Sequence, residues 1–172
     1  AFAVMTPRDL ARAVRLQVLG TGSYLPGHAI STAHLLTRAA ALSGAASTAG
    51  AAALSKRLGV RARHLARNLA AAVEAPRAAD DAPAMSTAAL RQALLEARLA
   101  PSELAWLLGH TTTPHTALPS NVAWTADALD YGGPHAELRQ ACTGFAAALT
   151  LAAPQVESLR TPVAIIGSEL GS

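Results

Sequence analysis

The sequence predicts an α/β fold with a largely parallel sheet, and three observations lead to this class. Short aliphatic runs of strand length alternate along the chain with stretches of helical periodicity. Hydrophobic residues make up 51% of the chain but aromatic residues only 3%, so the core has to be built from aliphatic side chains. The 172 residues are enough for one domain with a sizeable core.

Four short runs are the strand candidates, at residues 16–19, 104–108, 137–141 and 163–166. Two helices are predicted from a polar N-cap residue, Ser86 in one and Ser120 in the other. Their apolar positions are Leu90, Leu94, Leu95 and Leu99 after Ser86, and Val122, Ala123, Ala126 and Leu129 after Ser120. Two alanine-rich stretches, 40–53 and 70–84, are predicted as surface excursions or frayed helix.

The single cysteine, Cys142, precedes a helix predicted from Thr143 to about Leu159. This helix is apolar on both sides, which is typical of a buried helix, although Pro154 is expected to kink or end it at a cost of about 3 kcal/mol. One side carries Phe145, Leu149, Ala152 and Val156, and the other carries Ala146, Ala147 and Leu151. The strands of this chain are expected to cover only one of these sides.

Two interpretations of Cys142 follow from the residues alone. A lone cysteine in a reducing compartment is usually a small buried hydrophobic residue. Where a strand ends and a helix begins, however, the unpaired backbone amides carry roughly half a positive charge, which favours a thiolate and a developing oxyanion. Gly144 is expected to let the chain turn tightly there and to let a substrate approach.

Composition argues against several other classes of protein. One cysteine excludes an intrachain disulfide framework, and the net charge of +3 comes without a recognised nucleic-acid-binding module. An acidic partner or a phosphate-bearing ligand explains the basic excess better. No apolar run reaches membrane-spanning length and the first residues lack a secretory signal, so a soluble, cytoplasmic protein is expected.

Two further motifs favour structural interpretations. Gly20 and Gly22 lack the third glycine of a dinucleotide fingerprint, so a tight turn after the first strand is expected. His110 and His115 flank a threonine-rich loop, but no cysteine or acidic cluster accompanies them. No metal site is therefore predicted.

Four stretches, in order, resemble the N-terminal half of the β-ketoacyl-acyl-carrier-protein synthase III family: LGTGSYLP (19–26), KRLGVRARHL (56–65), TTTPHTALPSN (111–121) and QACTGFAAAL (140–149), followed by VAIIGSE (163–169). The resemblance implies a thiolase-like layered α/β/α/β/α fold, of which this chain forms the N-terminal of two duplicated halves. Residues 1–14 are then an N-terminal extension, and 15–172 are the half-domain that carries the nucleophile.

The resemblance also implies the chemistry. Cys142 is acylated by a thioester, and a malonyl thioester then loses carbon dioxide and attacks the acyl-enzyme in a Claisen condensation. No cofactor is tightly bound, and acyl-coenzyme A or acyl-carrier-protein thioesters are the substrates. The family's catalytic histidine and asparagine come from the C-terminal half, and none of the six histidines here matches them: His28, His34, His64, His110, His115 and His135.

The substrate-binding residues are assigned through the same resemblance as Arg57, Leu118, Gly144 and Phe145. Arg57 falls near the coenzyme A nucleotide in the family, within the basic cluster of Lys56, Arg57, Arg61, Arg63 and Arg67, which is otherwise a solvated face. The family's adenine-stacking tryptophan is missing near Ala53, which favours a carrier-protein-bound donor. Leu118 either reaches into a neighbouring subunit's acyl pocket or packs in a dimer interface.

The implied partners are an acyl carrier protein or coenzyme A thioester, and a C-terminal half or partner chain. Two such units are expected to pair as a homo- or heterodimer near 121–140. Two alternative functions stay open: an acyltransferase that passes the acyl group on without condensation, and an inactive structural subunit of a ketosynthase complex.

Overall fold

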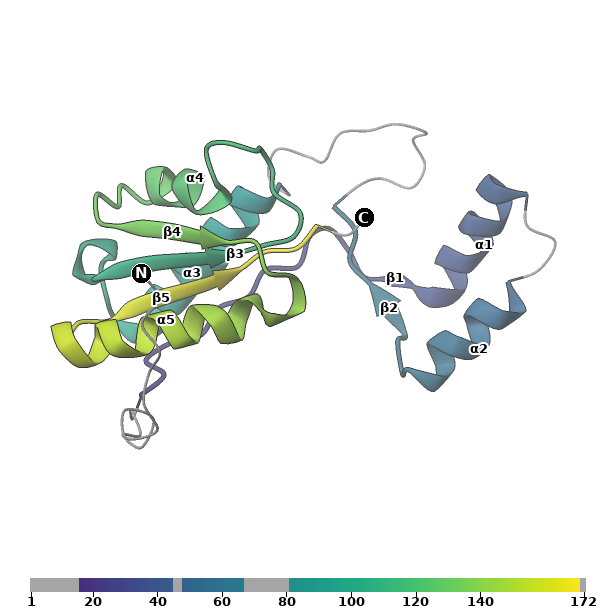
Figure 1. Cartoon of the computed structure of the whole chain (residues 1–172). Helices are drawn as coiled ribbons and strands as arrows, with labels where there is room; N and C mark the ends of the chain where they lie inside the picture. The colour runs from purple at the N-terminus through teal and green to yellow at the C-terminus, as the bar shows by residue number, and fades with distance from the viewer. Residues whose placement is uncertain (1–15, 45–47, 67–80, 171–172) are drawn as a thin grey trace, which may run out of the picture.

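The computed structural model describes residues 16–44, 48–66 and 81–170, and its main body is a three-stranded parallel sheet (Figure 1). β3 (Trp106–His110) lies at the centre, between β4 (His135–Leu138) and β5 (Val163–Gly167). Both pairings are parallel. The predicted α/β class with a parallel sheet is confirmed, and β5 starts where it was predicted. β3 lies two residues later than its predicted run, and β4 starts two residues and ends three residues earlier than its own.

Helices cover both faces of this sheet (Figure 1). α3 (Ala82–Ala97) and α4 (Asn121–Ala128) pack on one face and α5 (Gly144–Leu159) packs on the other. Side chains alternate along a strand, so Leu107 enters the first core and Leu108 the second. The first core contains Leu90, Leu94, Leu104, Leu107, Val122, Ala126, Tyr131 and Ile166, and the second contains Leu108, Ala148 and Ala152.

α3 begins earlier than predicted. Asp81 is its N-cap, and its carboxylate accepts a 2.8 Å hydrogen bond from the backbone N–H of Ala84. Ser86 lies buried inside the helix, where its hydroxyl donates to the carbonyl of Ala82 at 2.8 Å. The predicted start at Ser86 is therefore wrong, and Leu95, predicted on the apolar face, is 80% exposed.

The other two helix predictions fare better. Ser120 is confirmed as the N-cap of α4, because its side chain accepts from the N–H of Ala123. α5 ends at Leu159 as predicted and continues through Pro154 without stopping. Its buried stripe, however, consists of Gly144, Ala148 and Ala152, so the predicted stripe is correct only at Ala152.

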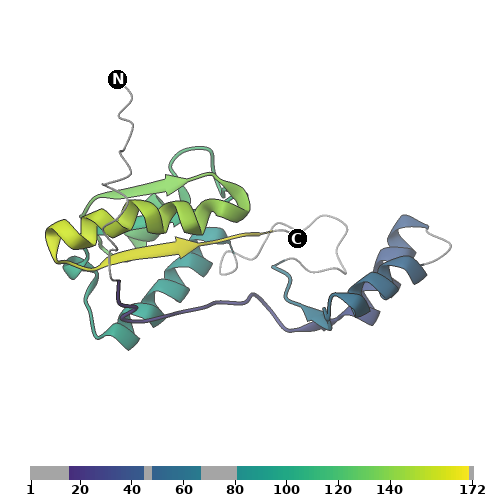
Figure 2. The ribbon, with the colours of Figure 1, turned by 60° about the horizontal axis from the view of Figure 1, so that its bottom comes forward.

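The predicted strand at 16–19 does not form, and the chain that follows it runs along α3 instead (Figure 2). The N–H groups of Thr21 and Ser23 donate at 2.8 Å to the side chains of Glu96 and Gln92. The hydrogen bonds from the N–H and then the hydroxyl of Thr21 lower the pKa of the Glu96 carboxyl, because they stabilise its charged form. Because the N–H groups of Thr21 and Ser23 pair with α3, they form no hydrogen bonds with the sheet. β5 remains an edge strand among the described residues.

Gly20 and Gly22 explain this close approach. A Cβ atom at Gly20 would lie 2.2 Å from the carbonyl oxygen of Ala93, and one at Gly22 would lie 2.0 Å from that of Ala89. The two glycines therefore allow the chain to lie flush against α3, and the tight turn expected for them is not observed.

A small arm stands away from the sheet (Figures 1 and 2). It contains α1 (Thr32–Ser43) and α2 (Ala49–Arg57), framed by the antiparallel pair β1 (Ile30–Ser31) and β2 (Ala62–Arg63). Neither helix has a buried residue, which agrees with the surface position predicted for the alanine-rich stretch 40–53. Residues 45–47 of that stretch lie outside the described residues.

Two other predictions fall outside the described residues. They are the extension at 1–14 and residues 70–80 of the second alanine-rich stretch, whose last residues begin α3. In the part of the chain that the structure describes, no helix combines the length and the apolar character needed to cross a membrane.

Candidate active site

Cys142 lies in a tight turn between β4 and α5. The turn is a short 3₁₀ helix, η4 (Ala141–Thr143), and the free thiol of Cys142 is exposed. Ala141, directly before the cysteine, has a φ of 43°, in the left-handed region that residues with a Cβ rarely adopt. Strain of this kind concentrates at functional sites. The predicted strand–helix junction is confirmed, and the interpretation of Cys142 as a buried hydrophobic residue is wrong for this chain.

The N-terminus of α5 next to the thiol has no side-chain cap. Thr143 occupies the N-cap position, but its hydroxyl donates to the carbonyl of Gln140 at 2.9 Å instead of accepting from the helix. The first-turn amides of α5 therefore keep their partial positive charge, which attracts a thiolate or an oxyanion.

Gly144 is the first residue of α5 and is buried. Its φ is −57°, which is ordinary helical backbone, so the tight-turn role predicted for it is wrong. The glycine is needed for a different reason. A Cβ atom at this position would lie 2.9 Å from both Cβ and Nδ1 of His110, so the absence of a side chain makes room for the imidazole.

His110, at the end of β3, is the residue that the sequence interpretation missed. Its ring also lies against Gly167, where a Cβ atom would come within 2.4 Å of Nε2. The ring of Phe145 meets it edge to face, with 6.3 Å between centroids and 66° between the planes. Nδ1 of His110 is buried and has no hydrogen-bond partner among the described residues, a situation that costs about 1–3 kcal/mol.

The remaining predicted substrate residues differ in where they lie. Phe145 is 56% exposed in the first turn of α5, beside the cysteine turn. Leu118 is 87% exposed in the loop before α4. Arg57 ends α2 in the arm, which Figure 1 shows apart from α5, so the structure does not bring it to Cys142. The exposed basic residues of the arm are Lys56, Arg57, Arg61 and Arg63, and Arg67 lies outside the described residues.

The threonine-rich loop after β3 is held to the chain after β5. The Glu169 carboxylate accepts from the N–H of Thr112 at 2.9 Å and from the hydroxyls of Thr112 and Thr113. Asn121 donates through Nδ2 to the Ser168 hydroxyl at 3.4 Å. The loop that carries Leu118 is thus fixed at the carboxyl end of the sheet, near the level of the cysteine turn.

Arg139 holds the outer part of the same loop. Its guanidinium pairs with Glu137 at 3.1 Å and donates to the carbonyls of Thr116 and Ala117 at 3.4 and 3.2 Å. The Glu137 side chain is only 4% exposed. Leu118 therefore projects from an anchored loop, which suits contact with a surface beyond this chain.

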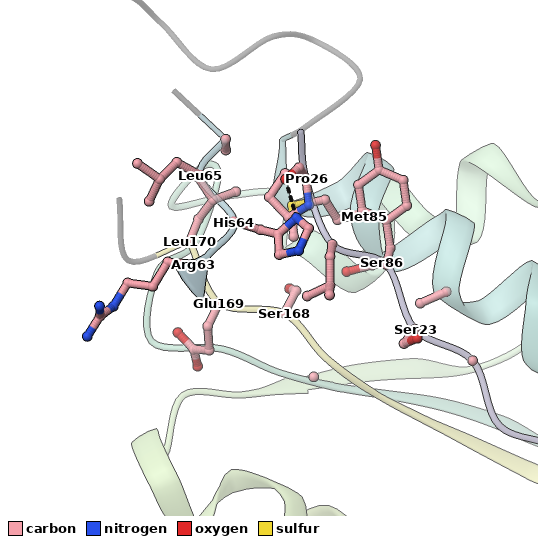
Figure 3. Close-up of a pocket in the computed structure, with 16 residues that line it drawn as sticks. Ser23, Pro26, Arg63, His64, Leu65, Met85, Ser86, Ser168, Glu169 and Leu170 are labelled. Atoms are coloured by element: carbon pink, nitrogen blue, oxygen red, sulfur yellow. Dashed lines mark hydrogen bonds between the residues drawn. The ribbon is translucent and has the colours of Figure 1, made fainter. Parts of the chain in front are cut away.

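A hollow of about 540 Å³ opens at the carboxyl end of β5 (Figure 3). It lies between the base of the arm, α3 and the residues after β5, and its labelled lining includes Ser23, His64, Ser86 and Ser168. His64 donates through Nδ1 to the carbonyl of Pro26 at 3.1 Å. Cys142 does not line this hollow. Within the described residues, no three potential metal-binding side chains come together.

Comparison with known proteins identifies relatives, although no family model matches the chain. It is 30% identical over 138 residues to the β-ketoacyl-[acyl-carrier-protein] synthase III of Thiobacillus denitrificans, covering 79% of this chain and 38% of the relative. It is 33% identical over 163 residues to the 3-oxopimeloyl-[acyl-carrier-protein] synthase of Rhodothermus marinus, covering 93% of this chain and 42% of that relative.

The fold agrees with these relatives. The crystal structure of 3-oxoacyl-[acyl-carrier-protein] synthase III from Aquifex aeolicus superposes with a TM-score of 0.70 at 27% identity, covering 88% of this chain and 44% of that chain. This chain thus spans about two fifths of the length of the curated relatives that it matches. On sequence and fold together, it belongs to the β-ketoacyl-[acyl-carrier-protein] synthase III family of thiolase-like proteins.

Proposed function

We propose that this chain is the N-terminal, nucleophile-bearing half of a condensing enzyme of this family. The observation that carries the proposal is the exposed thiol of Cys142 on a strained turn at the uncapped N-terminus of α5. A sulfur held there lies at the positive end of a helix dipole and beside the backbone N–H of Cys142, for which no hydrogen bond is found among the described residues. These are the features that an acyl-accepting cysteine needs.

The proposed reaction has two stages. The Cys142 thiolate attacks the carbonyl of an acyl thioester; the new C–S bond forms, and the donor's thiolate leaves and takes up the proton that Cys142 has lost. A malonyl thioester then loses carbon dioxide, and the electron pair of the broken C–C bond forms an enolate. The enolate carbon attacks the acyl group on Cys142, and the cysteine thiolate leaves.

The second stage requires groups that this half is not proposed to supply. The resemblance to the family assigns the decarboxylating histidine and asparagine to a second, C-terminal half. We therefore propose that the complete enzyme contains that half, on the same or another chain. It packs on the exposed side of α5.

Intact-protein mass spectrometry tests the nucleophile. The complete enzyme, incubated with an acyl thioester, gains the mass of one acyl group on the peptide that contains Cys142. Cys142→Ala abolishes this gain and leaves the unfolding temperature nearly unchanged, because it removes one exposed sulfur. Product formation by Cys142→Ala at an unchanged rate would disprove the assignment.

Carbon dioxide release separates condensation from simple transfer. We expect release from the malonyl thioester in proportion to product. Acylation of Cys142 without carbon dioxide release, with the acyl group passed to an alcohol or amine, would indicate the non-condensing acyltransferase. No acylation at all would indicate an inactive structural subunit.

We also propose an acyl carrier protein as the donor's carrier. The arm presents four exposed basic residues, Lys56, Arg57, Arg61 and Arg63, which suit an acidic protein surface. α2 carries no aromatic residue on which an adenine ring could stack. The relative from Rhodothermus marinus is named for a product held on an acyl carrier protein, so a similar enzyme recognises such a protein.

Competition kinetics test the donor. The carrier-protein thioester is expected to react at least as fast as the coenzyme A thioester of the same acyl group, and Arg57→Glu is expected to slow the carrier-protein reaction more than the coenzyme A reaction. This difference should shrink at high salt, because surface charges are screened. A strong preference for the coenzyme A thioester would contradict the proposal.

A further inference from the structure

His110 lies under the turn that carries Cys142, and no role is assigned to it above. We propose that His110 is a positioning residue for Cys142, and that its Nδ1 atom forms a hydrogen bond with the turn at residues 141–144 in the reacting enzyme. The inference rests on the proposed function, because it concerns the orientation of the same nucleophile.

The packing places the imidazole at this turn. His110 ends β3 on the α5 side of the sheet, the same side as Leu108. Nδ1 faces Gly144, the residue that opens α5, and Nε2 faces Gly167 at the end of β5. A methyl group on either glycine would have to displace the ring. The two backbones therefore form a slot that fits the imidazole edge.

The His110 ring and part of the turn above it have hydrogen-bonding groups without a partner among the described residues. Nδ1 of His110 is buried without a partner. In the turn above it, the N–H groups of Thr143 and Gly144 already donate to the carbonyls of Gln140 and Ala141. No hydrogen bond is found among the described residues for the N–H groups of Ala141 and Cys142. A buried polar atom close to backbone donors without partners calls for a bond between them. The bond forms when the turn adjusts on substrate binding.

The strained backbone explains why the turn needs support. Ala141 keeps its left-handed conformation only if its surroundings hold it there. The imidazole fills the space directly beneath the next helical residue, Gly144, so it limits how far the turn relaxes. His110 thereby fixes the direction in which the Cys142 thiol points.

Three substitutions in the complete enzyme test the role of Nδ1. His110→Asn keeps a polar atom at the position of Nδ1, and His110→Leu has nearly the same shape without one. His110→Gln moves the polar group outward to the position of Nε2. We measure the single-turnover rate of Cys142 acylation and the rate of Cys142 alkylation by iodoacetamide, both by peptide mass spectrometry.

We expect His110→Leu and His110→Gln to lose about tenfold in both rates, the effect of one lost hydrogen bond. His110→Asn should stay within about threefold of the wild type, although all three unfold at similar temperatures. His135→Leu, an exposed histidine on β4, is the background control and should change neither rate. Equal losses in the Asn and Leu variants, or no loss in either, would overturn the inference.

The test of the proposed function is distinct from the test of His110. If Cys142→Ala still forms product, the nucleophile assignment is wrong, and the alkylation rates continue to test whether Nδ1 orients the thiol. If Cys142→Ala is inactive but His110→Leu acylates at the wild-type rate, the function stands and the role of His110 is rejected.

Discussion

At the scale of single residues, the site depends on positions where a side chain would not fit. Gly144 and Gly167 both lie within contact of the His110 ring, and neither is explained by turn geometry at the cysteine. The sequence motif around Cys142 predicted that Gly144 matters, but for the wrong reason. The physical reason depends on a histidine 34 positions earlier in the chain, which local sequence cannot reveal.

Gly144→Ala should destabilise the protein by about 1–3 kcal/mol, because the new methyl group overlaps Cβ of His110. The measurement is thermal unfolding of the complete enzyme. Gly50→Ala is the matched control: it lies in α2 with nothing within 4 Å, so it should be neutral or slightly stabilising.

A double mutant then identifies the clash. In a His110→Gly background both the Cβ and the ring are absent, so Gly144→Ala should cost much less than in the wild type. Additive effects of the two substitutions would show that the methyl group meets something other than His110.

Cys142 and His110 show how far residue-level prediction reaches. The junction of a strand with an apolar helix was enough to place Cys142, because both elements have strong local patterns. His110 fell outside the predicted strand, which ended at Leu108, so its side could not be assigned. With β3 extended to His110, strict alternation puts it on the α5 face with Leu108. The signal was present but depended on a strand boundary.

At the scale of elements, the ends of helices and strands were harder to predict than their presence. Both Asp81 and Ser86 are good N-cap residues, and propensity alone does not choose between them. Packing decides, because a start at Asp81 buries Ala82 in addition to Leu90. The choice depends on long-range burial that the local sequence does not contain.

Paired substitutions test this helix start. Asp81→Ala should cost about 1 kcal/mol of stability, since Ala84 loses the acceptor for its N–H. Ser86→Ala should cost less, because its hydroxyl bonds only to the carbonyl of its own helix at Ala82. Unfolding temperatures that rank the two variants in the opposite order would restore Ser86 as the cap.

The predicted first strand failed for a similar reason. Residues 16–19 have strand composition, but the glycines after them bring the chain onto α3, where the side chains of Glu96 and Gln92 take its N–H groups. Strand composition indicates that a segment is extended, whereas its partner is decided by the rest of the fold.

The contact with Glu96 should depend on pH. Its pKa is lowered in the folded chain by hydrogen bonds from the backbone N–H and then the hydroxyl of Thr21. The stabilisation is therefore present above the pKa of an unfolded glutamate and is lost as pH falls through the folded value. The NMR shift of the Thr21 amide should titrate with a midpoint below that of an exposed glutamate.

Glu96→Gln provides the control for this titration. The amide oxygen of glutamine still accepts from Thr21 but carries no titrating charge, so the transition should disappear. A transition that persists in Glu96→Gln, or a midpoint above that of an exposed glutamate, would show that another group causes it.

At the scale of the whole molecule, the described part of the chain covers α5 on one side only. Its buried residues face the sheet, while Phe145, Leu149, Leu151 and Leu159 are 39–56% exposed. At about 25 cal/mol for each Å² of apolar surface, burying these residues contributes a few kcal/mol. That is a large part of a total stability of about 5–15 kcal/mol. The exposure of one side was predictable from the sequence, because the helix is apolar all round and the strands of this chain were expected to cover only one side.

The last prediction is that residues 1–172 expressed alone do not form a stable monomer. The exposed side of α5 should drive aggregation or leave a state without cooperative unfolding. Coexpression with a C-terminal half should restore solubility and cooperative unfolding. Leu151→Glu should make the isolated chain more soluble but prevent this recovery, because the charge lies in the surface to be buried. Leu95→Glu, at a still more exposed leucine on α3 across the sheet, should leave recovery intact. Solution mass and thermal unfolding measure each case. A cooperative monomer of the isolated wild-type chain, or equal effects of the two glutamates, would show that α5 needs no second layer.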